Sequence, residues 1–128
     1  MSVQKQILEA VIAMIDDLRL YAALDIGPLP ANNGLSIAPA SGGVEENTLV
    51  HGGQYIMTLV LNGKHAGQAA VFDALTTIHE HLEKLSVYPA GTNWAVTAIK
   101  SVGSPVYIDH DNNSWLYGSS IQIDYIID

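Results

Sequence analysis

The sequence contains no cysteine, which excludes disulfides, thiolate metal sites and cysteine nucleophiles together. Basic residues are also scarce: the 128 residues include 5 lysines and arginines against 13 aspartates and glutamates, for a formal net charge of −8. Proteins that bind nucleic acids need basic side chains to neutralise phosphates. Five scattered cations therefore argue against direct binding of DNA or RNA.

Long apolar runs are missing as well. No uninterrupted run approaches the ~18 residues needed to cross a bilayer, and the N-terminus lacks the basic and apolar regions of a signal peptide. We therefore expect no membrane partner and folding in a cytoplasm. The length suits one domain over residues 1–128, without an internal repeat or linker.

The composition is 48% apolar and only 14% charged. Ordinary soluble domains carry about a quarter charged residues, so part of this surface must be neutral or apolar. Such a surface on a small protein is often one that meets a partner. The composition therefore favours a protein that works by assembly.

The pattern of apolar residues predicts two helices and a sheet. Ser2 is a suitable N-cap for a helix that runs to about residue 20, and residues 66–85 form a second amphipathic segment. Uninterrupted runs of strands favour an antiparallel sheet. We predict an α+β fold: a mainly antiparallel sheet with the two helices packed on one face. Strands are expected over residues 35–38, 54–61, 94–102, 105–108 and 115–127, with turns at residues 62–64 and 109–114.

Residues 41–53 have glycine pairs near both ends and two adjacent acids between them, which predicts a long loop or a protruding hairpin. Loops of this length in a small domain are usually functional or mobile. We expect this segment and the adjacent sheet edge to contribute to subunit contacts. The candidate interface residues are Val44, Glu45, Glu46, Leu49, Val50 and Tyr55.

His79 and His81 invite a metal interpretation, but residues two apart on a helix point about 200° away from each other. A helical zinc pair needs i, i+4 spacing. Only His79 and Glu83 could share a face. We therefore expect a solvated helix face near a C-terminal end, where histidine suits the helix dipole.

Asp109, Asp111 and Asn113 resemble the start of a calcium loop. Ser114 stands where that loop needs glycine, and Ser120 stands where it needs a bidentate glutamate. Asp and Asn are ordinary turn residues between strands. We therefore predict no metal and no other cofactor, and we treat these three residues as candidates for contact with a partner.

The sequence has no nucleophile elbow, phosphate loop or dinucleotide fingerprint. The acid pairs Asp16-Asp17 and Glu45-Glu46 are adjacent in sequence and are expected to be solvated. No catalytic residue emerges, so we predict that the protein is not an enzyme.

The order of these features resembles one known family. An amphipathic helix is followed by a glycine and proline passage at residues 26–30 and an acidic loop at residues 45–53. Small residues open the second helix, and the last strands follow Pro105 and an Asp and Asn turn. Over nearly the whole chain, this order is similar to the minor capsid or tail terminator proteins of long-tailed bacteriophages.

That resemblance implies a structural virion protein at the head–tail junction, made in the bacterial host's cytoplasm. It implies a homo-oligomeric ring, commonly a hexamer, that caps the polymerised tail tube. Its expected partners are the major tail tube protein and a head completion protein. DNA would pass through the lumen without specific binding, since an acidic lining repels it. The alternatives are another head–tail connector or neck component and a small-ligand-binding α+β domain.

Overall fold

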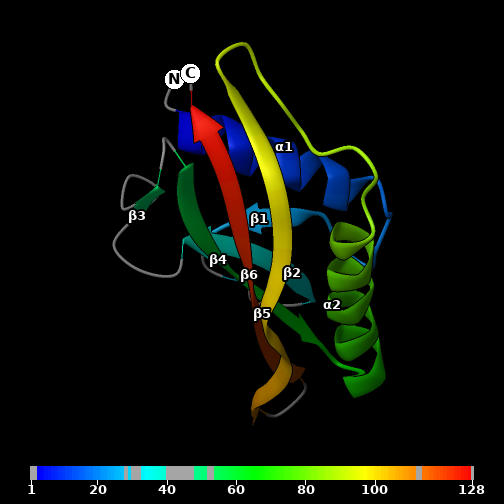
Figure 1. The fold of residues 1–128 in the computed structure, drawn as a ribbon. Coiled ribbons are helices and arrows are strands. Elements are labelled where there is room, and N and C mark those ends of the chain that lie inside the picture. The colour runs from blue at the N-terminus through cyan, green and yellow to red at the C-terminus, as the bar shows by residue number, and fades with distance from the viewer. Residues whose placement is uncertain are drawn as a thin grey trace.

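The computed structural model describes residues 3–27, 29, 33–39, 48–51, 54–111 and 114–127, with the main chain alone for 48–51 and 111. Two helices and a mostly antiparallel sheet confirm the predicted α+β fold (Figure 1). The elements in chain order are α1 (Val3–Asp16), β1 (Leu24–Ile26), β2 (Gly34–Pro39), β3 (Thr48–His51), β4 (Gln54–His65), α2 (Gln68–Glu83), β5 (Trp94–Asp111) and β6 (Ser114–Ile127).

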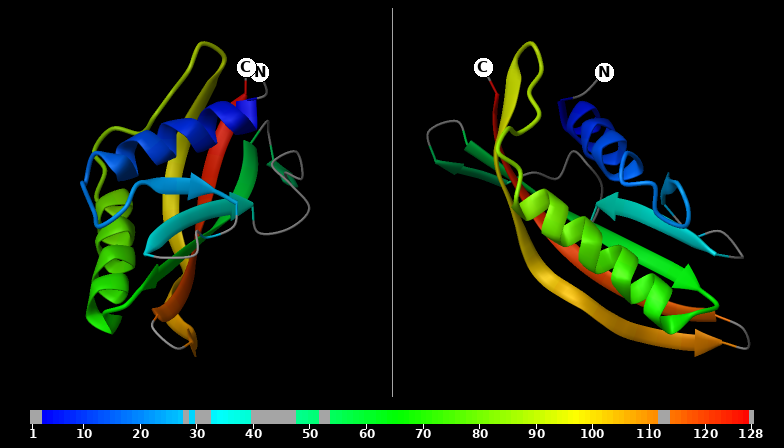
Figure 2. Two further views of the ribbon diagram at one scale, coloured as in Figure 1. Left: turned by 180° about the vertical axis from the view of Figure 1, so that it is seen from behind. Right: turned by 90° about the vertical axis from the view of Figure 1, so that its right-hand side faces the viewer.

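The sheet has the strand order β1-β2-β4-β6-β5. One edge of β4 pairs along its whole length with β6, and its other edge is shared by β2 and β3. β1 and β2 are parallel, whereas the other described pairs are antiparallel. Strands β1 and β5 therefore lie at opposite edges of one curved sheet (Figure 2).

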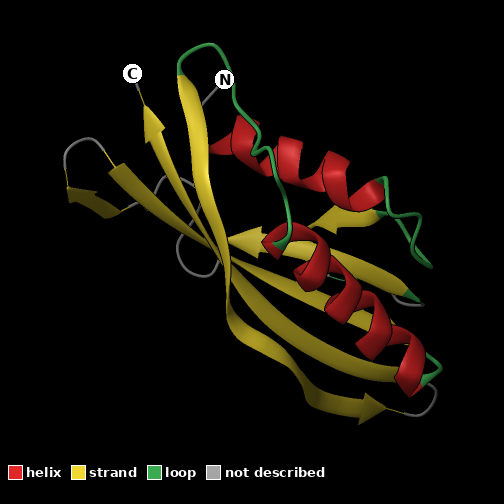
Figure 3. Cartoon of the chain, turned by 45° about the vertical axis from the view of Figure 1, so that its right-hand side comes forward, coloured by secondary structure: helices red, strands yellow, loops and turns green. Residues whose placement is uncertain are grey.

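Both helices pack on the same face of this sheet (Figure 3). Tyr117 and Tyr125 are eight residues apart on β6, so their side chains share a face. The Tyr117 hydroxyl accepts a hydrogen bond of 2.6 Å from Gln68 of α2, and the Tyr125 hydroxyl accepts one of 3.5 Å from Gln4 of α1. The core lies between these layers. Its fully buried side chains include Ile7, Val11, Leu35, Ile37, Leu59, Leu61, Val71, Leu75, Ile78, Leu82, Ile123 and Tyr125.

The first helix ends earlier than the sequence predicts. α1 stops at Asp16, not near residue 20, and Arg19 adopts a left-handed backbone with φ of 53°. Asp16 Oδ1 accepts a hydrogen bond of 2.9 Å from the backbone N–H of Leu24, which draws the chain into β1. Sequence reasoning missed this three-residue strand. Ser2, the expected N-cap, lies outside the described residues.

The predicted turn at residues 62–64 is wrong, because β4 continues to His65. Asn62 pairs with Ser36 on one side and with Gly118 on the other, so neighbouring strands satisfy the backbone that a turn would have used. Gly63 is needed here for packing: a Cβ built on it would lie 2.6 Å from Cγ2 of Val71 in α2. Pairing with the neighbouring strands and packing against α2 therefore outweigh the preference of Asn62 and Gly63 for a turn.

The two strands predicted over residues 94–102 and 105–108 form the single strand β5, whose pairing with β6 shifts register at four places. The predicted turn at residues 109–114 is correspondingly too long. Asp109 and Asp111 belong to β5 and pair with Leu116 and Ser114. Only residues 112–113, which lie outside the described residues, separate the two strands.

Candidate subunit interface

The outer half of strand β5 carries four large apolar side chains in the solvent. They form what we call the β5 patch, and each is more than half exposed: Val102 (53%), Val106 (57%), Tyr107 (53%) and Ile108 (51%). Folded proteins expose single apolar side chains routinely. Val106 and Ile108 share one face of this edge strand, and Tyr107 between them points to the other face. A group of exposed apolar side chains on one edge strand is a candidate for contact with a partner.

The β5 patch extends over both faces of the sheet. Tyr107 pairs with Tyr117 and lies on the face that the helices cover. Ile108 lies on the opposite face, where its Cδ1 would be 2.6 Å from a Cβ built on Gly118. No described element covers that opposite face. The hairpin end of β5 and β6 lies far from the start of α1 and the end of β6 (Figure 1). The patch runs from Val102, in the middle of β5, to Ile108 near that hairpin end.

Aromatic rings support the patch from the helix side. Tyr107 makes edge contacts with Trp115 and Tyr117, at centroid distances of 5.9 and 6.0 Å. Tyr117 in turn contacts Phe72 of α2 at 5.9 Å, and Phe72 is 42% exposed. Rigid aromatic side chains bury large areas at little cost in conformational entropy, and they dominate the energetics of many interfaces.

The patch is electrically neutral in an acidic protein. Residues 102–108 include no charged side chain, although the chain carries a formal charge of −8. The nearest charge before them is Lys100, whose Nζ lies 3.2 Å from the carboxylate of Asp124. The exposed Asp109 follows Ile108 directly, so the uncharged run lies between a paired cation and an acidic residue.

The outer edge of β5 is poorly suited to regular strand addition. Pro105 lacks a backbone N–H, one register shift precedes it between Ser101 and Gly103, and another spans it between Gly103 and Val106. Proline and bulges are features by which edge strands avoid unwanted pairing. A partner at this edge would bind mainly through the apolar side chains.

The prediction that His79 lies on a solvated helix face is wrong. Its side chain is 4% exposed and lies between α2 and β5. Ser101 Oγ is 2.6 Å from His79 Nδ1 and donates a hydrogen bond of 2.6 Å to Oε1 of Glu83. The single hydroxyl proton goes to the carboxylate, so His79 must carry its own proton on Nδ1 and donate it to Ser101.

This cluster does not have the order of a nucleophilic triad. In a triad the histidine accepts the serine proton and the acid orients the histidine. Here the acid contacts the serine, and His79 Nε2 is buried without a hydrogen-bond partner among the described atoms. Burial lowers the pKa of His79 below its ordinary value of 6.5, while the charge of Glu83 acts to raise it. The cluster joins α2 to β5.

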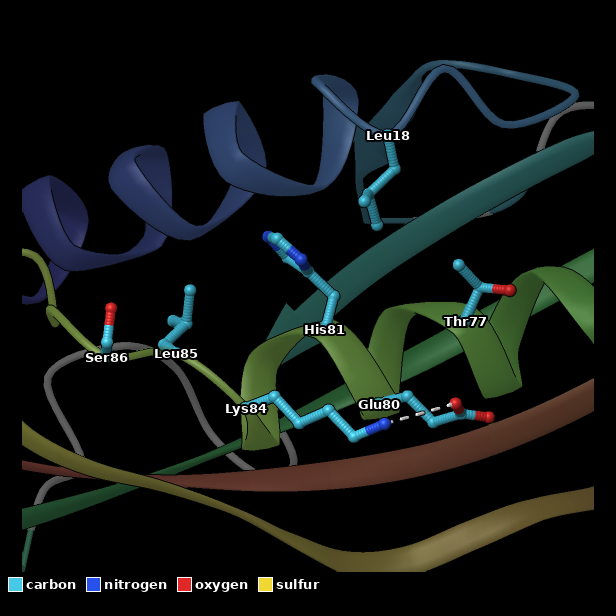
Figure 4. Close-up of a pocket in the computed structure, with 7 residues that line it drawn as sticks. All are labelled: Leu18, Thr77, Glu80, His81, Lys84, Leu85 and Ser86. Carbon is cyan, nitrogen blue, oxygen red and sulfur yellow. Dashed lines mark ion pairs between the residues drawn. The ribbon is translucent and has the colours of Figure 1, made fainter.

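His81 does not share this buried environment. It lines a surface groove of about 440 Å³ where the C-terminal ends of α1 and α2 approach each other (Figure 4). Glu80 and Lys84 border the groove and form an ion pair of 3.9 Å. Each lining residue is exposed or only half-buried, so the groove is a shallow feature, unlike the enclosed apolar pockets that hold small ligands. Its lining residues are Leu18, Thr77, Glu80, His81, Lys84, Leu85 and Ser86.

Three of the six predicted interface residues lie beyond the described residues, and only the main chain is described for two more. Val44, Glu45 and Glu46 fall within residues 40–47, which are not described. Leu49 and Val50 belong to β3, whose backbone pairs with the start of β4 as a hairpin. The ring of Tyr55 is half-buried and stacks on Tyr125 at 5.5 Å. Their role at a subunit contact stays a prediction.

The predicted partner-contact residues lie at the hairpin end. Asp109 is exposed and its carboxylate accepts a hydrogen bond of 2.8 Å from the backbone N–H of His110. Of Asp111 only the backbone is described, and Asn113 lies outside the described residues. Within the described part of the chain, no group of three or more acidic or histidine side chains could hold a metal ion.

Sequence reasoning missed the β5 patch. The signal was present as the uncharged, apolar residues 102–108, but such a run also predicts a buried strand. Only the strand order, which places β5 at an edge, distinguishes the two. The His79 cluster left no local signal, since Ser101 is 22 residues away in sequence.

Comparisons with known proteins add no family assignment. No family model matches the chain, and a search of functionally described proteins finds no match. None of the described helices is long and apolar enough to cross a membrane.

Proposed function

We propose that the protein is a structural subunit of the virion of a long-tailed bacteriophage, a tail terminator. In this role several copies form a ring, for which we propose six, on the end of the tail tube. The single observation that best supports an assembling protein is the β5 patch, an exposed and uncharged apolar surface on an otherwise acidic chain. The order of the elements resembles that of tail terminators, and for this reason we propose this kind of assembly.

The net negative charge of the chain suits such a ring. A ring at the head–tail junction surrounds DNA, and an excess of 13 acidic over 5 basic residues disfavours adhesion of that DNA to the lumen. Uncharged surface then serves contacts between subunits, where like charges would repel. DNA therefore passes through the ring without being bound.

The ring has two further partners in this proposal. One face meets the major tail tube protein and stops growth of the tube, and the other face meets a head completion protein. Asp109, at the hairpin end of β5 and β6, is an exposed candidate for one of these contacts. The protein folds in the bacterial cytoplasm and ends in the virion, at the head–tail junction.

Electron microscopy of phage tails tests this proposal. An affinity label on the protein is expected at one end of the tail, the end that joins the head, with a ring visible in end-on views. A label on the head side of the junction but absent from isolated tails would instead identify another connector component. A label absent from both structures would contradict a virion role.

A further inference from the structure

We draw no further inference here: the strongest candidate, the apolar surface cavity of about 370 Å³ that Gln68, Ala69 and Phe72 of α2 form with Tyr117 of β6, carries nothing, because nothing in the described part of the structure shows what covers it.

Discussion

Ser101 Oγ lies 2.6 Å from Nδ1 of the buried His79, and this contact joins the edge strand β5 to helix α2. The same hydroxyl donates to Glu83, one helical turn after His79. The outer half of β5 begins directly after Ser101. The contact therefore holds α2 and the base of the strand that carries the β5 patch in a fixed relative position.

Removal of the Ser101 hydroxyl is expected to destabilise the fold. In Ser101→Ala the N–H of His79 loses its acceptor in a buried site, which typically costs about 1–3 kcal/mol. Urea denaturation of the wild type and the variant measures the difference in the free energy of unfolding. Thr97→Ala on the same strand is a matched control, because its exposed hydroxyl bonds only a backbone carbonyl at 3.2 Å. Equal losses in both variants would contradict a special role for Ser101.

His79 makes the stability of the protein depend on pH. Burial lowers the pKa of His79 in the folded state below 6.5, so the unfolded chain takes up its proton more readily than the folded one. This contribution to stability is present above pH 6.5 and is lost as the pH falls through the lower pKa of the folded protein.

His79→Asn keeps a donor near Nδ1 and removes this titration. We expect the free energy of unfolding of the variant to change less than that of the wild type between pH 7.5 and 5.5, a range set by the pKa of ordinary histidine. His81→Asn is the control, since His81 is only half-buried and lies on the groove. An unchanged pH dependence in His79→Asn would show that another group is responsible.

Tyr21 makes the stability of the protein fall as the pH rises in the alkaline range. Burial raises its pKa from 10.0 to about 12, although a hydrogen bond with the backbone of Lys64 acts to lower it. Its hydroxyl donates a hydrogen bond of 2.8 Å to the carbonyl of Gly34. The stability that Tyr21 contributes is therefore complete below pH 10 and is lost as the pH rises through about 12. Tyr21→Phe is expected to be less stable at pH 8 and to lose less stability on titration to pH 11; parallel curves would contradict the assignment.

Gly63 permits the close approach of α2 to the sheet. Gly63→Ala would place a Cβ 2.6 Å from Val71 and 3.2 Å from Leu35, and overpacking of this kind costs about 1–3 kcal/mol. The loss should be smaller when Val71→Ala is also present, because the clashing methyl group is then absent. Thermal denaturation of both single variants and the double variant measures this coupling. Additive losses would show that the contact is not what selects glycine.

The packing of two helices on a sheet can largely be predicted from the sequence, because it depends on the spacing of apolar residues along the chain. The apolar stripes of residues 3–16 and 68–83 and the alternation of Ile121, Ile123 and Tyr125 identify the helices and the last strand. The errors occur where a distant strand decides the local structure. Asn62 and Gly63 have the residue types of a turn, yet pairing with β2 and β6 keeps them in a strand.

The candidate interface is harder to predict from the sequence. Exposure of Val106 and Ile108 depends on the place of β5 in the strand order, and the sequence gives no direct indication of that order. The burial of His79 likewise depends on the crossing of α2 over β5. The predicted contacts in residues 41–53 rest on composition alone and stay predictions.

The growth of tail tubes in the presence of this protein tests the proposed role most directly. Tubes polymerised from the tail tube protein of the same phage are expected to stop lengthening and to carry a ring of this protein at one end. Val106→Asp should abolish the ring and restore growth, because a carboxylate in the β5 patch must lose its hydration on contact. Val87→Asp should act as the wild type. Unchanged tube lengths, with no protein at either end, would contradict the proposal.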